Sequence, residues 1–300
     1  MEKISYQGLP NCYRFFNESI ELIVTTDFGP HIIRFGFVGQ QNEFIDVTPQ
    51  GFPCQQDVAP CGFAGHRLWH APDARPRSVI PDKEPVVVEQ HDNFIRFTQP
   101  TQTATGIQKE IDLPMSPDGV HVAVVHRLYN RGLWPVELAP WALSVMAPGG
   151  KAIIPLPPRG SPAENLLPIS MMAIWAFSNL SDPRLILGRQ YIMLCQDRDS
   201  PEPLKTGVMV SDGWTAYYNN GHLFVKTFDY KSGALYPDLG CSVESFTNEA
   251  FLELETLAPL TLLQPDGSVE HIENWFLFRD IPELRTDSDI EQHILPLIKS

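Results

Sequence analysis

The sequence predicts an all-β fold, a large antiparallel β-sandwich formed by one domain that spans residues 1–300. Three observations lead to this prediction. Twenty-eight prolines and 20 glycines interrupt short apolar segments, a spacing that suits strands and turns better than long helices. Hairpin turn sequences lie between several of these segments. Helix signals are few, and all-β chains of this length often form a single domain.

The predicted strands are short runs that are apolar or alternate between apolar and polar residues, and turn residues bound them. In chain order they are 20–25, 31–37, 86–90, 94–99, 107–113, 120–128, 136–145, 191–195, 207–210, 214–218, 222–228, 251–257 and 270–278.

Turn sequences support these assignments. Asn219-Asn220-Gly221 joins two strand-like runs, and Asn-Gly is the strongest short hairpin signal because a type I′ turn needs positive φ at both central residues. Three further turns are predicted at 91–93, 117–119 and 265–267.

Two segments depart from the strand pattern. Ser288 is predicted to cap a short helix that runs through His293, with Pro296 ending it. Residues 155–179 contain many prolines and read as a long excursion over the sheet. Such excursions often border a site.

Composition excludes several classes of function. The 36 acidic against 22 basic residues give a net charge of −14, which argues against nucleic acid and anionic membranes as partners. The first residues lack the features of a secretory signal, and no apolar run approaches the ~20 residues of a membrane span. The odd, scattered cysteines predict reduced thiols and a cytoplasmic location; they are Cys12, Cys54, Cys61, Cys195 and Cys241.

The segment 251–257 alternates strictly. On a strand, Glu253 and Glu255 would share one face with Phe251, and Leu252 and Leu254 would anchor the other face in the core. The two carboxylates would lie roughly 7 Å apart. A carboxylate on a rigid strand suits a general base, although a solvated strand face has the same pattern.

Three segments in order, 21–35, 126–138 and 251–275, resemble the galactose mutarotase-like (aldose 1-epimerase-like) superfamily, and within it a bacterial branch. They correspond to the opening hairpin, a central strand pair and a late strand that bears a glutamate. The resemblance implies a β-supersandwich with a groove of carbohydrate size.

The resemblance also implies catalytic roles. The late glutamate of these epimerases is the general base, and Glu255 matches it best, with Glu253 second. The general acid is a histidine that would fall within 138–144, where this chain has Trp141 and no histidine. An indole can stack on a sugar ring, which suits binding without chemistry.

The stretch 62–72 offers substitutes for that acid. It holds His66, Arg67, Trp69 and His70 between glycine and proline residues, which predicts a recognition loop in which either histidine is the acid and Arg67 and Trp69 bind sugar. Alternatively, Trp69 is a core anchor and the histidines bond to carbonyls. No metal site is predicted, because Arg67 stands where the zinc motif has glutamate.

A third group contains the aromatic residues of 214–218 together with Lys226 and Asp238. Lys226 and Asp238 would hydrogen-bond sugar hydroxyls if they point to the same cleft. The alternative is a surface lysine and a turn aspartate.

These patterns favour a carbohydrate-binding protein that interconverts the anomers of an aldose or aldose phosphate by acid–base catalysis, without a cofactor. The alternative is a non-catalytic carbohydrate-binding or regulatory module that has lost the acid. A glycosidase or polysaccharide lyase is less favoured, because such enzymes usually add a helical domain. The expected partner is a small-molecule carbohydrate, and the sequence leaves the sugar and the oligomeric state open.

Overall fold

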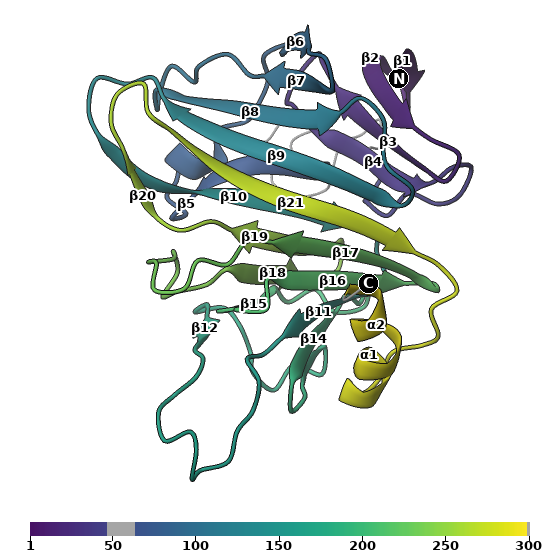
Figure 1. Cartoon of the computed structure of the whole chain (residues 1–300), viewed down its shortest axis with the longest axis vertical. Coiled ribbons are helices and arrows are strands. Elements are labelled where there is room, and N and C mark those ends of the chain that lie inside the picture. The colour runs from purple at the N-terminus through teal and green to yellow at the C-terminus, as the bar shows by residue number, and fades with distance from the viewer. Residues whose placement is uncertain (47–63, 299–300) are drawn as a thin grey trace.

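The computed structural model describes residues 1–46 and 64–298 as two large antiparallel β-sheets packed face to face, which confirms the predicted all-β sandwich (Figure 1). Cys54, Cys61 and Gly62 lie outside the described residues. No described helix is long and apolar enough to cross a membrane.

Sheet A has 11 strands. In spatial order they are β1 (Glu2–Tyr6), β2 (Leu9–Phe16), β3 (Ile20–Thr25), β4 (Ile32–Phe37), β5 (Gly65–Ala71), β10 (Val136–Met146), β19 (Leu252–Leu257), β18 (Val243–Thr247), β15 (Leu204–Val208) and β12 (Met172–Ile174), with β20 (Thr261–Leu263) paired to β10.

Sheet B has 10 strands, and Figure 1 follows it from β7 and β8 at the top to β14 at the bottom. In spatial order they are β13 (Leu185–Leu187), β14 (Tyr191–Cys195), β11 (Lys151–Pro155), β16 (Trp214–Asn219), β17 (His222–Phe228), β21 (Ser268–Phe278), β9 (His121–Asn130), β8 (Ile107–Pro114), β7 (Phe94–Thr98) and β6 (Val87–Gln90).

The hairpin between β16 and β17 has the predicted turn. Asn220 has a φ of 50° and Gly221 a φ of 81°, which is the pair of left-handed conformations that a type I′ turn requires. The turn aligns Tyr217 with Phe224 in the ladder, and both rings are buried in the core between the sheets.

The core between the sheets is built from alternate residues of both. Leu252 and Leu254 of β19 pack there, together with Phe35, Phe224 and Trp275. The ring of Trp275 lies 5.4 Å from the rings of both phenylalanines. These contacts decide which face of β19 points inward.

Two local predictions were wrong. The stretch around His66 is a strand, β5, and not a loop, because its backbone pairs with β4 and β10. Helix α1 (Asp287–His293) is capped by Thr286 and not by Ser288: the Thr286 side chain accepts from the Asp289 amide, and the Asp289 carboxylate accepts from the Thr286 amide.

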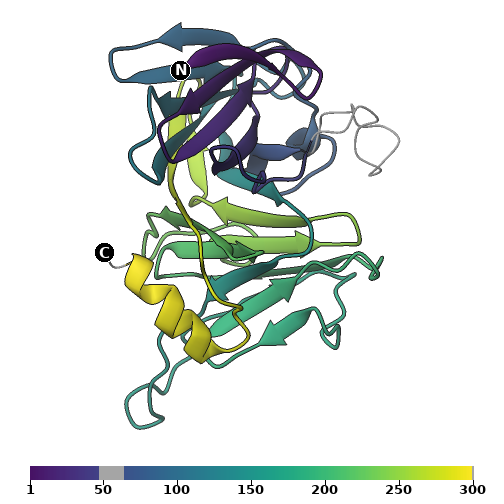
Figure 2. The ribbon, with the colours of Figure 1, turned by 90° about the vertical axis from the view of Figure 1, so that its right-hand side faces the viewer.

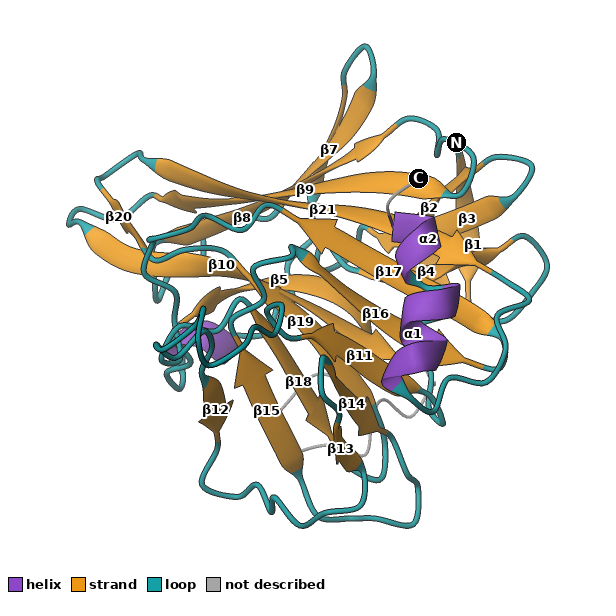
Figure 3. Ribbon diagram, turned by 60° about the horizontal axis from the view of Figure 1, so that its bottom comes forward, coloured by secondary structure: helices purple, strands orange, loops and turns teal. Residues whose placement is uncertain are grey.

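The chain continues past α1 into helix α2 (Leu295–Ile298), so Pro296 lies near the start of a second helix and does not end the first. Figure 2 and Figure 3 show the two helices on one side of the molecule. Ile290 and Ile294 pack against the outer face of sheet B, beside Ile153 and Trp214.

Gly65 begins β5 at a point where a side chain has no room. Its φ is +70°, and an added Cβ would overlap the Ile32 carbonyl oxygen. We expect Gly65→Ala to lower the free energy of unfolding by about 3 kcal/mol, measured by urea denaturation.

Gly39 provides the matched control, because its φ is +73° and an added Cβ would meet nothing within 4 Å. Gly39→Ala should therefore cost only the left-handed strain of about 1–2 kcal/mol. Equal losses in the two variants would contradict the overlap with Ile32.

Candidate functional site on the outer face of sheet A

Neighbouring strands of sheet A bring together the side chains of the candidate site. Side chains alternate between the faces of a strand, and the ladders align Leu143 of β10 with both Arg67 of β5 and Glu255 of β19. These three residues therefore share one face. Leu252 and Leu254 point to the core, so Glu255 lies on the outer face, opposite the leucines as predicted.

Three charged side chains meet on this outer face. Glu244 of β18 stands directly opposite Glu255 in the ladder. The Nζ atom of Lys205, on β15, lies 2.7 Å from Glu244 Oε2 and 3.0 Å from Glu255 Oε2. The indole N–H of Trp141 donates a hydrogen bond of 2.7 Å to Glu255 Oε2. The two carboxylates thus share one cation.

Burial makes both carboxyls weaker acids than an exposed glutamate. Glu244 and Glu255 have no exposed surface. Burial raises the pKa of Glu255 although the Lys205 ammonium opposes this shift. Burial also raises the pKa of Glu244 well above its ordinary value, and the charges of Glu255 and Asp238 add to the shift. Because one ammonium cannot balance two buried carboxylates, we infer that the pair retains a proton, on Glu244.

Each carboxyl has an oxygen without a hydrogen-bond partner. Glu244 Oε1 and Glu255 Oε1 have none among residues 1–46 and 64–298, and Glu244 Oε2 also lacks a hydrogen bond, although it forms an ion pair with Lys205 Nζ at 2.7 Å. A buried acceptor without a partner costs about 1–3 kcal/mol, and such groups are rare in native proteins outside functional sites. The two oxygens are therefore suited to a ligand or a transferred proton.

Aromatic rings surround the shared cation. Lys205 Nζ lies 4.8 Å from the ring centroid of Trp141 and 4.7 Å from that of Trp175. Trp175 belongs to the 155–179 excursion, and Ser178 ties that segment to β15: its Oγ donates to the Lys205 carbonyl at 2.6 Å and accepts from the Lys205 amide at 2.9 Å. The predicted excursion therefore borders this group.

Arg67 and Trp69 form the other end of the group. Arg67 Nη2 lies 2.8 Å from Glu253 Oε1, and its guanidinium stacks 4.5 Å from the ring centroid of Trp69. The Trp69 ring meets Trp141 edge to face at 5.5 Å. Aromatic rings beside a small number of charged groups are typical of small-molecule binding sites.

The two histidines predicted as acids point the other way. On β5 they alternate with Arg67 and Trp69, so they face sheet B. His66 lies 4.7 Å from the Trp275 ring. His70 is buried, and burial lowers its pKa to about 3. Neither histidine lies with Glu255, because the loop assumed for this stretch is a strand and its alternation separates them.

Several solved structures are similar to this one over most of their length. It is similar to a galactose mutarotase-like protein from Lactobacillus casei ATCC 334 (TM-score 0.60, 9% identity, 89% of this chain and 100% of that chain). It is also similar to a galactose mutarotase related enzyme from Lactobacillus acidophilus (TM-score 0.56, 8% identity, 91% and 99%). A suspected aldose 1-epimerase from Escherichia coli K12 matches at a TM-score of 0.55 (12% identity, 90% and 99%).

The chain has the galactose mutarotase-like fold. The resemblance inferred from the three sequence segments is therefore confirmed at the level of the fold. No protein-family model matches the sequence, and no curated protein sequence matches it.

Within the galactose mutarotase-like fold, two further predicted residues, Lys226 and Asp238, do not contact Glu255 through a hydrogen bond or ion pair among the described residues. Lys226 is fully buried on the inner face of β17, and its Nζ donates to Glu273 Oε1 at 2.9 Å. It does not point to the predicted cleft, because its side of β17 faces sheet A from within the sandwich. Asp238 lies in the turn after Tyr236 with a φ of 50°, and its charge acts on Glu244.

Sequence reasoning missed Glu244, Lys205 and Trp175. Residues 243–247 read Val-Glu-Ser-Phe-Thr, which breaks the alternation of apolar and polar residues, so the local pattern gives only a weak strand signal. Nothing in the local sequence pairs Glu244 with Glu255, because the two meet only through the β18–β19 ladder.

Proposed function

We propose that this protein binds a small-molecule carbohydrate on the outer face of sheet A and interconverts the anomers of an aldose. Glu255 is the general base and Glu244 is the general acid, and before the sugar binds Lys205 is paired with both carboxyls. The observation that carries the proposal is the facing pair of buried carboxyls, each with an oxygen that lacks a partner.

The reaction needs only proton transfer. Glu255 accepts the proton of the anomeric hydroxyl while Glu244 gives its proton to the ring oxygen, so the bond between the anomeric carbon and the ring oxygen breaks and an aldehyde forms. Rotation of the aldehyde and the reverse transfers close the ring in the other anomer. Two carboxyls whose environments separate their pKa values provide both roles near neutral pH.

Access to the carboxyls requires a local movement. Glu255 has no exposed surface, and Lys205 keeps only 8% of its surface exposed. A sugar would therefore displace the Lys205 side chain from between Trp141 and Trp175. The apolar face of the sugar would then pack against the two rings in place of the lysine. The lysine side chain is long and flexible, so the displacement needs no movement of the backbone.

A non-catalytic binding module is the second candidate. The salt bridges of Lys205 to Glu244 and Glu255 favour it, because a base that is already paired is less available for proton abstraction. In that case the protein would bind sugar through Trp69 and Trp141 without changing the anomer ratio.

Anomer exchange measured by NMR separates the two functions. We expect the wild-type protein to accelerate exchange for at least one member of a panel of aldoses and aldose 6-phosphates. Glu255→Gln should lower that acceleration by about 10²–10⁴-fold.

Sugar-dependent chemical-shift changes in the same experiment report binding. Binding without acceleration in the wild-type protein would assign the chain to the binding modules. If Glu255→Gln accelerates exchange as much as the wild-type protein does, the general base is another residue.

A further inference from the structure

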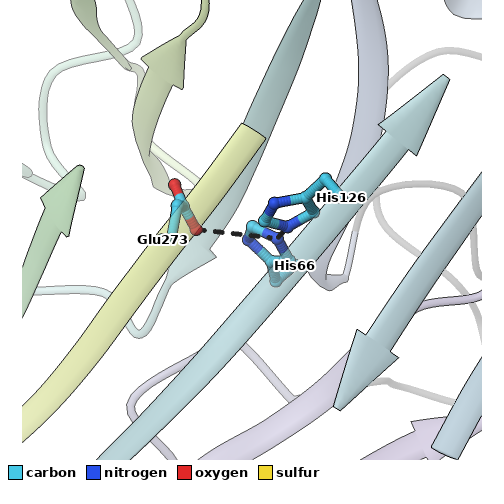
Figure 4. Close-up of side chains that lie close together, drawn as sticks. All are labelled: His66, His126 and Glu273. Atoms are coloured by element: carbon cyan, nitrogen blue, oxygen red, sulfur yellow. Dashed lines mark hydrogen bonds and ion pairs between the residues drawn. The ribbon is translucent and has the colours of Figure 1, made fainter. Parts of the chain in front are cut away.

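A polar cluster lies between the two sheets, away from Glu255. His66 of β5, His126 of β9 and Glu273 of β21 have no exposed surface, and their ligand atoms all lie within 4.8 Å of one another (Figure 4). His66 Nε2 is 2.7 Å from His126 Nε2 and 3.8 Å from Glu273 Oε2. The cluster therefore draws one residue from sheet A and two from sheet B to a common point.

The outer nitrogen of each imidazole is anchored. His126 Nδ1 lies 2.9 Å from the His271 carbonyl oxygen, and a carbonyl only accepts, so Nδ1 carries the proton and Nε2 presents a lone pair to the cluster. His66 Nδ1 lies 2.9 Å from Ser144 Oγ, which can donate or accept. Metal-bound histidines usually have such partners on their second nitrogen.

The charge states suit a cation ligand set. The two Nε2 atoms lie 2.7 Å apart, and His126 carries its proton on Nδ1, so His126 is neutral and accepts from His66. Glu273 Oε1 lies 2.9 Å from the Lys226 ammonium, which favours the ionised carboxylate. Two neutral imidazole nitrogens and one carboxylate oxygen are a donor set typical of zinc.

We propose that His66, His126 and Glu273 bind one divalent cation, with zinc the best match, and that this ion joins sheet A to sheet B. The cation takes the place of the hydrogen between the two Nε2 atoms. His66 changes tautomer: its proton leaves Nε2 and is carried on Nδ1, which then donates a hydrogen bond to Ser144 Oγ, so no proton leaves the site.

Coordination requires a small expansion. Zinc–nitrogen bonds are about 2.0–2.1 Å long, so the two Nε2 atoms must move apart from their 2.7 Å separation. The site is enclosed by Trp275, whose ring lies 4.7 Å from His66. Because the three ligands are buried, a substrate could not reach the ion, so the ion would join the sheets and would not take part in catalysis.

Lys226 opposes the cation. Its Nζ lies 2.9 Å from Glu273 Oε1, and its positive charge would repel a dication bound to the other oxygen. Removing that charge with Lys226→Met should therefore tighten zinc binding by about tenfold or more. An increase in affinity is a result that loss of folding cannot produce.

The experiment is a zinc titration of the full chain after treatment with a chelator, followed by competition with a chromophoric chelator. We expect one equivalent of zinc to bind the wild-type protein. His126→Gln should weaken binding by at least about 100-fold, since changes to outer partners alone cost 10–100-fold. His70→Gln is the matched control on the same face of β5 as His66 and should leave the affinity unchanged.

Cobalt(II) provides a second readout. The folded wild-type protein should give the visible absorption of cobalt(II) bound to imidazole nitrogens, and Lys226→Met should give it at lower metal concentration. The proposal is overturned if neither the wild-type protein nor Lys226→Met binds an equivalent of zinc or cobalt. Equal zinc affinity in folded His126→Gln would overturn it as well.

Discussion

Replacing Glu244 with glutamine is expected to lower the rate of anomer exchange by about 10²–10⁴-fold, the usual contribution of one positioned acid. Glutamine has nearly the same shape, and it also leaves Lys205 next to the single charge of Glu255. The variant should therefore fold and still bind sugar. NMR exchange spectroscopy measures the rate, and chemical-shift titration of the same sample measures the affinity.

The pH dependence gives this prediction a second test. Exchange requires an ionised Glu255 and a protonated Glu244, so the wild-type rate should fall both at acid pH and at alkaline pH. The alkaline limb belongs to Glu244, whose pKa burial raises well above its ordinary value. Glu244→Gln should lose that limb and keep the acid limb.

Glu270→Gln is the control for this variant. Glu270 lies on β21 in sheet B and is paired with Arg127 at 2.8 Å, away from the carboxyl pair. It should exchange anomers at the wild-type rate. A Glu244→Gln protein that is as active as this control would show that the acid is another group.

Acidification is expected to destabilise the protein strongly between pH 6.5 and pH 5. Five buried histidines have pKa values that burial lowers below the ordinary value of 6.5: His31, His66, His70, His126 and His271. Below pH 6.5 these histidines are protonated in the unfolded chain but stay neutral in the folded chain. Stability is therefore complete above pH 6.5 and is lost as the pH falls toward the folded-state values.

The loss should amount to several kcal/mol. Each histidine contributes about 1.4 kcal/mol per pH unit over the interval between its two pKa values. For His70 and His271 the interval extends to about pH 3. Four groups oppose the trend, because their pKa values are raised in the folded state: His222 by its hydrogen bond to Glu43, and Glu43, Glu244 and Glu255 by burial. They reduce the loss that the five histidines cause.

Urea denaturation at a series of pH values measures this dependence. His70→Leu is an informative variant, because neither ring nitrogen of His70 has a hydrogen-bond partner in the described part of the chain. The variant should show a shallower loss of stability below pH 6.5. A wild-type free energy of unfolding that stays constant from pH 7 to pH 5 would contradict the prediction.

Local sequence predicted most of the strands because strand periodicity and turn chemistry act over a few residues. The alternation around Glu255 assigned its side chain to the face opposite Leu254, and Asn220-Gly221 specified a hairpin turn. Short strands such as β18, and β5 with its polar residues, were missed because their pairing partners, and not their own composition, stabilise them.

The candidate site was predicted only in part for the same reason. Period two determines which residues of a strand share a face, so Arg67 and Trp69 were separable from His66 and His70 once β5 was known to be a strand. It does not determine which face meets the other sheet. That choice depends on packing of distant residues such as Trp275 against His66.

The sequence by itself determined the all-β class, the hairpin turns and the placement of Glu255 on the strand face opposite Leu252 and Leu254, because each follows from relations between near neighbours in the chain. Only the tertiary structure decided that Glu244 faces Glu255, that Lys205 lies between them, and that His66 meets His126 and Glu273 in the interior. Those encounters are set by ladder register and sheet packing, which join residues more than ten positions apart and leave no trace in any local pattern.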